Sequence, residues 1–208
     1  MTNPAQICRL AILISGRGSN LVALADAVSD GRIPGSEISL VISDHPDAVG
    51  LQHAQERGLK TLVLERSGGS RESHDHRIVA ALQENRIDLV CLAGYMRLLS
   101  HDFVEAFRGR ILNIHPSLLP AFPGLAAPEQ ALEHGVKWSG CTVHFVDETL
   151  DGGAIIAQKI VPVLDGDTEA TLSARILEQE HQLYAEAIAL VVSGKYQTVG
   201  RRVRRTER

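Results

Sequence analysis

Cysteine is scarce in this sequence, which contains only Cys8, Cys91 and Cys141. The three are far apart and form no Cys-x-x-Cys pair, so the pattern argues against a disulfide framework and against a zinc site. Cys91 and Cys141 lie within apolar runs, which predicts that they are buried and pack as small core residues. The chemistry of the protein therefore rests on other side chains, and we expect no metal ion to take part.

Long apolar runs are also missing. No run reaches the roughly 20 residues that a membrane-spanning helix needs, and the first residues do not join a charged segment to an apolar one. We therefore expect no membrane association, no signal peptide and a cytoplasmic location. A large excess of charge of one sign is absent too. The formal net charge is −4, so nucleic acid is not an expected partner.

What the sequence does contain is typical of one globular α/β domain. Its 208 residues are 44% hydrophobic and 22% charged, which is enough to bury one sizeable core. In the first half, apolar runs that predict strands alternate with amphipathic segments that predict helices, and Ser70 is placed to cap one of these helices. The predicted strands are 10–14, 38–42, 61–64, 89–93 and 111–114, and the predicted helices are 20–28, 48–57 and 71–84, with a short helix near Phe103.

The repeated strand–helix–strand order predicts the fold class. Continuous apolar strands joined by helices are typical of a Rossmann-like, mostly parallel twisted sheet with helices on both faces. After residue 115 the pattern changes, because residues 142–146 and 154–163 predict two neighbouring strands, which we expect to be antiparallel. Residues 172–192 predict a long amphipathic helix. Residues 200–208 are basic and poor in apolar side chains, which predicts a solvated, weakly ordered tail.

A glycine-rich segment, Ser-Gly-Arg-Gly-Ser-Asn, follows the first predicted strand at residues 15–20. It lacks the third glycine of a dinucleotide-binding loop and the Lys-Ser/Thr pair of a P-loop. Gly16 and Gly18 permit a tight turn and a close approach to a ligand. Ser19 and Asn20 bring polar donors to the start of the next helix, where free N–H groups favour an anion such as a phosphate monoester. A plain turn with a Ser or Asn N-cap explains the segment equally well.

The strongest pattern is Asn-Ile-His-Pro-Ser-Leu-Leu-Pro at residues 113–120. Side chains two apart on a strand share a face, so Asn113 and His115 project together while Ile114 faces the other way. Pro116 ends the strand pairing because it has no N–H to donate. An amide and an imidazole side by side can both donate hydrogen bonds. The alternative is a capped strand end with an ordinary core histidine.

A second polar segment, Leu-Asp-Gly-Gly at residues 150–153, contains Asp151. Its two glycines permit positive φ and leave room for another molecule, although Asp-Gly is also a common turn pair. A carboxylate next to His115 would favour the imidazolium and raise the pKa of the histidine. A charged histidine beside the Asn113 amide suits acyl transfer, since both stabilise an oxygen that becomes negative. His144 lies in a predicted strand. It is either a hydrogen-bonded core residue or a residue that holds the side chains of this site in place without touching the ligand.

The chain resembles the phosphoribosylglycinamide formyltransferases, a family of folate-dependent formyltransferases, over nearly its whole length. The segments that carry the resemblance are residues 13–21, 92–100, 113–120, 142–153 and 178–181. Several folate-dependent formyl enzymes share Asn-Ile-His-Pro-Ser-Leu-Leu-Pro and Leu-Asp-Gly-Gly, so these segments mark the chemistry. The Gly-x-Gly-Ser-Asn loop and the compact length mark the branch that acts on the ribonucleotide.

The resemblance implies an activity and a division of the chain. It implies transfer of a formyl group from the cosubstrate 10-formyltetrahydrofolate to the amine of 5-phosphoribosylglycinamide in purine biosynthesis, by a monomer or homodimer. It implies a single domain over residues 1–208, with a ribonucleotide-binding part over 1–112, a folate-binding and catalytic part over 113–195, and a basic tail over 196–208.

The resemblance also implies roles for individual residues. Catalysis falls to Asn113, His115 as proton donor and Asp151, which raises the pKa of the histidine. The implied ribonucleotide contacts are Gly18, Ser19, Asn20 and Glu180. The implied folate contacts are Arg71, Met96, Arg97, Leu98, Leu99, Asn113, Asp147, Glu148, Thr149 and Leu150.

Other functions remain alternatives. Pro128 stands where relatives commonly have a histidine, and Leu-Ala-Ala-Pro at 125–128 is similar to methionyl-tRNA formyltransferase. That enzyme should carry a further C-terminal domain and a basic surface for tRNA, and formyltetrahydrofolate hydrolase should carry an extra N-terminal domain. We expect neither here. A non-catalytic nucleotide-binding module would leave Asn113, His115 and Asp151 unexplained.

Overall fold

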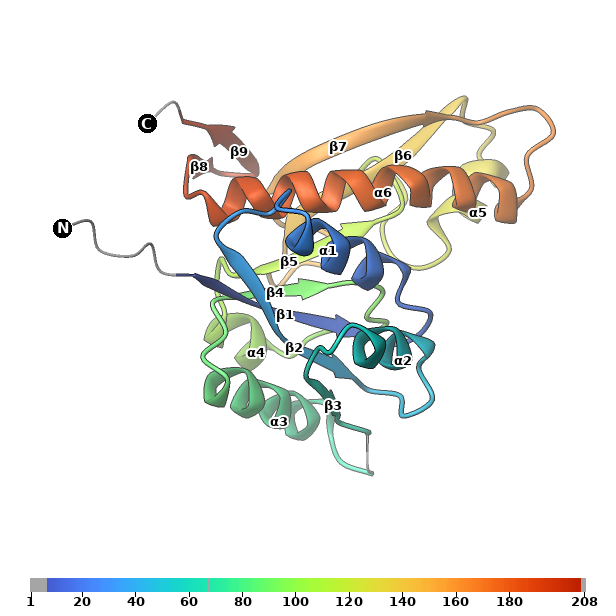
Figure 1. The fold of residues 1–208 in the computed structure, drawn as a ribbon. Helices are drawn as coiled ribbons and strands as arrows, with labels where there is room; N and C mark the ends of the chain where they lie inside the picture. The colour runs from blue at the N-terminus through green and yellow to red at the C-terminus, as the bar shows by residue number, and fades with distance from the viewer. Residues whose placement is uncertain (1–6, 67, 207–208) are drawn as a thin grey trace.

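The computed structural model describes residues 7–66 and 68–206 and contains a single nine-stranded sheet of order β3-β2-β1-β4-β5-β6-β7-β9-β8 (Figure 1). The strands are β1 Cys8–Ile14, β2 Ser36–Ser43, β3 Thr61–Val63, β4 Leu89–Leu92, β5 Ile111–His115, β6 Trp138–Phe145, β7 Ile155–Pro162, β8 Tyr196–Val199 and β9 Arg202–Arg205. The helices are α1 Ser19–Ser29, α2 Val49–Glu56, α3 Arg71–Glu84, α4 His101–Ala106, α5 Ala127–Glu133 and α6 Glu169–Val192.

The direction of the strands confirms the predicted fold class. Parallel pairs join β1 to β2 and to β4, β2 to β3, and β4 to β5. The pairs β5–β6 and β6–β7 are antiparallel, as expected for the second half of the chain. The β1 strand is apolar over most of its length because both of its faces are covered.

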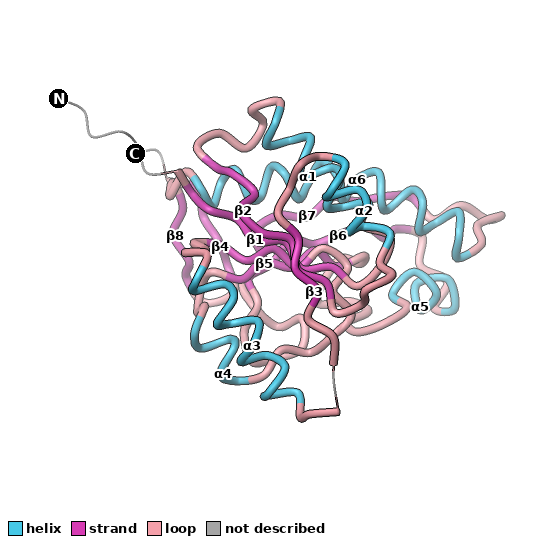
Figure 2. Tube along the Cα trace, turned by 60° about the horizontal axis from the view of Figure 1, so that its bottom comes forward, coloured by secondary structure: helices cyan, strands magenta, loops and turns pink. Residues whose placement is uncertain are grey.

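Helices cover the two faces of the sheet (Figures 1 and 2). On one face α1, α2 and α6 contribute Leu24, Leu51 and Ile188 to the larger apolar cluster. On the other face α3 and α4 contribute Leu82 and Phe103 to a second cluster. The helices therefore bury their apolar faces against the sheet and leave its carboxyl edge to the loops.

The carboxyl edge of the parallel strands is where this fold can hold a ligand. The strand order reverses at β1, which has β2 on one side and β4 on the other, and such a switch point opens a crevice between loops. Here the loops after β1 and β4 touch each other. The Met96 N–H donates to Ser15 Oγ at 3.0 Å, and the Ser15 N–H donates to the Gly94 carbonyl at 3.1 Å.

The prediction of a weakly ordered tail over residues 200–208 is wrong for Arg202–Arg205, which form β9. The preceding residues Tyr196–Val199 form β8. Together the two strands form the β8–β9 hairpin, which joins the sheet beside β7. Two apolar contacts hold it, because the Tyr196 ring lies 5.8 Å from the Phe145 ring and Val203 packs against the larger cluster. The sequence pattern did not reveal these contacts, because exposed arginines dominate the composition of the hairpin. Residues 207 and 208, also in the predicted tail, lie outside the described residues.

The sequence did not predict helix α5. Pro128 stands in its first turn, where a missing N–H breaks no helical hydrogen bond. The residue that departs from the family pattern therefore fits the start of a helix. None of the helices within residues 7–66 and 68–206 combines the length and the apolar character needed to cross a membrane.

Candidate active site

Strand β5 places the two polar side chains of the Asn-Ile-His-Pro segment at the carboxyl edge of the sheet. In the antiparallel β5–β6 pair, Asn113 lies opposite His144 and His115 lies opposite Thr142. Side chains opposite each other in such a pair share a face. Ile114 packs in the larger cluster on the other face of the sheet. The prediction that Asn113 and His115 share one face of the strand while Ile114 faces the other way is confirmed.

His115 is nearly buried, with 5% of its surface exposed. Its Nε2 lies 2.9 Å from the Phe122 carbonyl oxygen, and its Nδ1 lies 3.5 Å from Asp151 Oδ2. A carbonyl and a carboxylate only accept hydrogen bonds, so both ring nitrogens face acceptors. Only the imidazolium carries a proton on each nitrogen, and these surroundings suit it. The predicted approach of Asp151 to His115 is found.

Asp151 is held in place by the backbone around it. Its φ is 49°, in the left-handed region, and its Oδ2 accepts a hydrogen bond of 2.8 Å from the Gly124 N–H. The expectation for the following glycines is wrong, since neither has a positive φ in the left-handed region. A Cβ on Gly153 would meet the Phe145 carbonyl oxygen, and one on Gly152 would meet the Thr149 side chain. These glycines permit close packing of the loop against Thr149 and Phe145.

His144 fixes the orientation of the Asn113 amide. The Nδ1 of His144 lies 2.8 Å from the Phe145 carbonyl and donates to it, so a neutral ring has a free acceptor at Nε2. Burial lowers the pKa of His144, which keeps the ring neutral, although the Phe145 carbonyl and Asp151 oppose this shift. Asn113 Nδ2 lies 3.2 Å from Nε2 and donates to it. The second Nδ2 proton of Asn113 stays available to a ligand.

The pair of His144 and Asp151 is not an ion pair in this arrangement. His144 Nε2 lies 3.7 Å from Asp151 Oδ1, but a neutral imidazole carries no charge to pair with a carboxylate. Asp151 therefore directs its charge to His115, where both ring nitrogens already face acceptors. The carboxylate of Asp151 thus lies between two histidines, and burial lowers the pKa of one of them, His144.

The glycine-rich loop after β1 is built on a glycine contact. Gly18 has φ 75°, and a Cβ there would lie 2.5 Å from the Gly50 Cα, so no larger side chain fits. Gly18 is also the N-cap of α1 and provides no side-chain cap. The alternative of a Ser or Asn N-cap is therefore wrong, and the first N–H groups of α1 lack a side-chain partner. A helix start of this kind attracts an anion.

Asn20 and Glu180 meet beside this loop, although 160 residues separate them. Asn20 Nδ2 donates to Glu180 Oε2 at 2.8 Å, and both side chains are buried. Burial raises the pKa of Glu180, and the hydrogen bond from Asn20 opposes this shift. Asn20 Oδ1 has no hydrogen-bond partner among the described residues. The structure therefore joins two of the predicted ribonucleotide contacts.

Seven of the predicted folate contacts line two separate cavities. Arg71, Met96, Arg97 and Leu98 line one of about 540 Å³. Asp147, Glu148 and Thr149 line another of about 500 Å³ beneath the β8–β9 hairpin. Leu99 lines neither and packs against the second apolar cluster, and Leu150 is 55% exposed. The structure brings the first four together but does not join them to residues 147–150.

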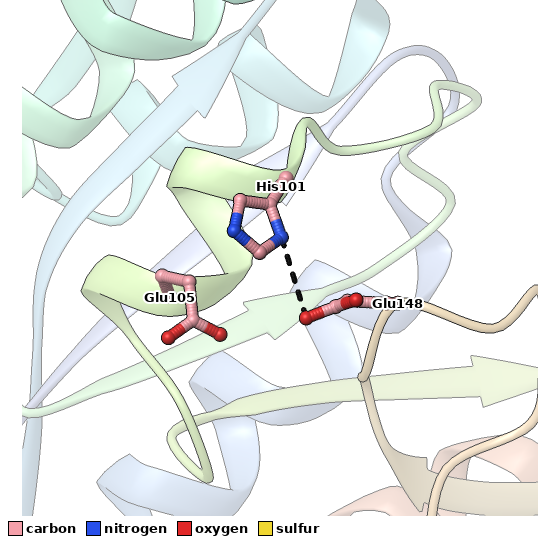
Figure 3. A group of neighbouring side chains, drawn as sticks. All are labelled: His101, Glu105 and Glu148. Carbon is pink, nitrogen blue, oxygen red and sulfur yellow. Dashed lines mark ion pairs between the residues drawn. The ribbon is translucent and has the colours of Figure 1, made fainter.

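A group of potential metal ligands lies on the outside of the 147–150 loop. Ligand atoms of His101, Glu105 and Glu148 lie within 4.8 Å of one another (Figure 3). His101 Nδ1 pairs with Glu148 Oε1 at 3.3 Å, and Arg108 pairs with both glutamates. All of these side chains are exposed. They form an ion-pair network that ties α4 to the loop, with the Arg108 guanidinium supplying the positive charge.

Several functional contacts escaped the sequence-based prediction. The Phe122 carbonyl and the Gly124 N–H, which contact the His115–Asp151 pair, belong to a loop of no regular structure. Backbone groups carry no sequence signal of their own. Asp44 and Arg66 line the cavity of Arg71 and Arg97. The only signal for them is their position just after the strands β2 and β3, where ligands bind in parallel sheets.

The fold and this site define a class of protein. An amide, an imidazole and a carboxylate meet at the carboxyl edge of a mixed sheet, next to an uncapped helix start. The chain belongs to the formyl transferase family, whose sequence model matches residues 8–188.

Within that family, the chain is similar to enzymes of purine synthesis. It is 44% identical to the phosphoribosylglycinamide formyltransferase of Escherichia coli K12 over 187 residues, which cover 89% of this chain and 88% of the relative. It is 50% identical to the trifunctional purine biosynthetic protein adenosine-3 of Drosophila melanogaster over 188 residues, which cover 89% of this chain but 14% of the relative. The crystal structure of glycinamide ribonucleotide transformylase 1 from Symbiobacterium toebii matches with TM-score 0.96 and 50% identity, over 100% of this chain and 98% of that one.

Proposed function

We propose that the protein transfers the formyl group of 10-formyltetrahydrofolate to the amine of 5-phosphoribosylglycinamide, giving formylglycinamide ribonucleotide and tetrahydrofolate. One observation carries the proposal: His115 lies between Asp151 and the Phe122 carbonyl, two residues from Asn113 on the same face of β5. Two donors thus lie together at the sheet edge where a ligand can enter. The name of the E. coli relative supports the choice of acceptor.

The two donors suggest how the reaction proceeds. The neutral amine attacks the formyl carbon, a C–N bond forms, and the formyl oxygen becomes negative. Asn113 donates to this oxygen with its second Nδ2 proton, and His115 donates from Nε2 after the oxygen replaces the Phe122 carbonyl. We assign the exchange to Nε2 because Nδ1 faces the charged Asp151. The bond to the folate nitrogen then breaks as a proton passes from the attacking nitrogen to the leaving nitrogen.

The loop after β1 is suited to the ribonucleotide. Its phosphate would bind at the start of α1, where Gly18 provides no side-chain cap and free N–H groups favour an anion. Glu180, held by Asn20, would accept a hydrogen bond from the glycinamide end. The strands β1 and β5 are separated by β4 alone, so the two ends of the substrate site lie about 10 Å apart, at about 4.8 Å per strand.

A competition between acceptors tests the proposal. The purified protein with 10-formyltetrahydrofolate is expected to release tetrahydrofolate only when glycinamide ribonucleotide is present, with formylated ribonucleotide as the product by mass spectrometry. Release in water alone would identify the hydrolase activity instead, and formylation of methionyl-tRNA would identify the tRNA enzyme. Treatment with EDTA serves as a control and is expected to change nothing, because no proposed step uses a metal.

Replacement of Asp151 by asparagine is expected to slow the reaction. The variant keeps the shape of the side chain but removes the charge that lies 3.5 Å from His115 Nδ1. We expect turnover to fall by about 10- to 100-fold, which is part of the 10²–10⁴-fold that a general acid contributes.

The matched control is Asp165→Asn, which changes an exposed carboxylate that pairs with Lys137. It is expected to leave turnover in steady-state kinetics unchanged. An Asp151→Asn protein with the same turnover as the unmodified protein would contradict the role given to this carboxylate.

A further inference from the structure

Two neighbouring residues of helix α3, His74 and Asp75, are buried away from the catalytic side chains. Their side chains are 3% and 1% exposed, and His74 Nδ1 lies 3.6 Å from Asp75 Oδ1. Neither residue lines the cavity of Arg71 and Arg97. Carboxylates and imidazoles are seldom buried this completely unless other polar groups hold them. The groups that hold these two belong to the loops after β3 and β4.

Asp75 is bonded to the end of the loop after β4. Its Oδ2 accepts a hydrogen bond of 2.5 Å from the Ser100 N–H, and both residues are buried. Ser100 is also the N-cap of α4, where its Oγ accepts from the Phe103 N–H at 3.3 Å. The backbone of Ser100 therefore has a bond to α3 that is separate from the cap of α4. Hydrogen bonds to a charged group are among the stronger ones in proteins.

His74 is bonded to the loop after β3. Its Nε2 lies 2.6 Å from the Leu64 carbonyl oxygen and donates to it, because a carbonyl only accepts. Leu64 directly follows β3 and stands two residues before Arg66, which lines the cavity of about 540 Å³. Residues 96–98, in the loop after β4, line the same cavity. Two adjacent side chains of α3 thus hold two loops that form walls of one cavity.

Asp75 also lies near the other end of the loop after β4. The Tyr95 hydroxyl is buried and has no hydrogen-bond partner among the described residues, and the same holds for Asp75 Oδ1. Burial raises the pKa of Tyr95, and the charges of Asp44 and Asp75 raise it further, so this hydroxyl lies near both carboxylates. Tyr95 and Ser100 flank residues 96–99, the predicted folate segment. Asp75 is therefore close to both ends of this segment without being part of it.

The exposed part of residues 96–99 depends on backbone anchors. Met96 and Leu98 are 68% and 59% exposed, so their side chains add little packing. At the start of the segment the Met96 N–H donates to Ser15 Oγ at 3.0 Å, and just after its end the Ser100 N–H donates to Asp75. A loop that is already held in its bound shape loses little further freedom when a ligand binds, which favours affinity.

We propose that Asp75 is a positioning residue for the formyl donor, which fixes residues 96–99 through the Ser100 N–H without touching the folate. His74 supports it by holding the facing loop through the Leu64 carbonyl. The proposal rests on the proposed function, since it concerns the folate that residues 96–99 would contact. Loss of the Asp75 bond should therefore affect the KM for the folate and not the KM for the ribonucleotide, whose proposed contacts lie on α1 and α6.

The first test is steady-state kinetics of two matched variants at Ser100. Both Ser100→Ala and Ser100→Pro lose the Oγ that caps α4, but only the proline variant loses the N–H that donates to Asp75. The φ of Ser100 is −72°, which proline can adopt. We expect the KM for 10-formyltetrahydrofolate to be about tenfold higher in Ser100→Pro than in Ser100→Ala, the effect of one hydrogen bond to a charged group. The kcat and the KM for the ribonucleotide should be equal in the two variants.

Variants of Asp75 test the other partner of the bond. Asp75→Ala removes the acceptor and should raise the folate KM by a similar factor, whereas Asp75→Asn keeps an oxygen for the Ser100 N–H and should restore most of the affinity. The control Glu84→Ala removes an exposed carboxylate at the end of the same helix and should change neither KM. A folate KM that is equal in Ser100→Pro and Ser100→Ala, or in Asp75→Ala and the unmodified protein, would overturn the proposal.

Hydrogen exchange followed by mass spectrometry tests the anchor without catalysis. In the protein without substrates, amides of residues 95–101 should exchange faster in Asp75→Ala than in Asp75→Asn, while those of β1 exchange equally in both. Faster exchange throughout the sheet, or failure of both Asp75→Ala and Ser100→Pro to fold, would show a purely structural role and overturn the proposal. Absence of turnover by the unmodified protein would instead overturn the proposed function, with the exchange result unaffected.

Discussion

Replacement of His115 by alanine is expected to lower turnover by about 10²–10⁴-fold, the contribution typical of a general acid. Both ring nitrogens of His115 face acceptors, the Asp151 carboxylate and the Phe122 carbonyl. The ring therefore suits a proton on each nitrogen. Alanine removes the proton donor and leaves the nearly buried Asp151 carboxylate without its histidine partner, while the Gly124 N–H still donates to it. Steady-state kinetics with glycinamide ribonucleotide measures the loss.

The His115 variant needs two controls. His76→Ala removes an exposed histidine of α3 that pairs with Asp102, and we expect it to keep full activity. Circular dichroism and thermal melting show whether the His115 variant stays folded, which we expect because the side chain lies at the sheet edge, outside both apolar clusters. A folded His115→Ala protein with unchanged turnover would refute the mechanism.

Replacement of Asn113 by alanine is expected to lower turnover by about 10²–10³-fold, the usual effect of losing one oxyanion donor. The physical reason is orientation. His144 accepts one Nδ2 proton of Asn113, which directs the amide nitrogen, not the oxygen, toward the reaction centre. A donor that acts only on the developing negative oxygen affects the transition state alone, so kcat should fall while KM stays nearly constant.

The isosteric variant Asn113→Asp sharpens this test. Aspartate has the size of asparagine but carries no donor, and its charge would repel the developing oxyanion. We expect its turnover to be no higher than that of the alanine variant. In the unmodified protein, burial lowers the pKa of His144. The ring that accepts from Asn113 should therefore stay neutral at pH values where an ordinary histidine is protonated. Protonation of His144 should not lower the rate at those pH values. An aspartate variant that retains activity would exclude the donor role of Asn113.

The sheet could be predicted from the sequence because its signal is local. Continuous apolar runs mark strands with two covered faces, and all five predicted parallel strands lie where β1 to β5 are found. The hairpin of β8 and β9 could not be predicted in this way. Its two anchoring contacts, by Tyr196 and Val203, are each made with residues from distant parts of the chain, and the arginines around them dominate the composition.

The site was predictable only where neighbours in sequence are neighbours in space. The period of a strand placed Asn113 and His115 on one face. Other groups reach the site only through hydrogen bonds between parts of the chain that are distant in sequence. These are Glu180, His144 and the backbone groups of Phe122 and Gly124. No local pattern specifies such contacts. The resemblance to a family supplied Glu180, and for His144 the strand pattern left a core role and a supporting role open.

The sequence by itself determined the alternation of strands and helices, the facing of Asn113 and His115, and the glycine-rich turn after the first strand. Each of these follows from the chemistry of residues within a few positions of one another. Only the tertiary structure decided that Asp151 reaches His115, that His144 orients Asn113, and that three arginines share one pocket. These depend on which strands become neighbours, and that choice is made by burial of apolar surface over the whole chain.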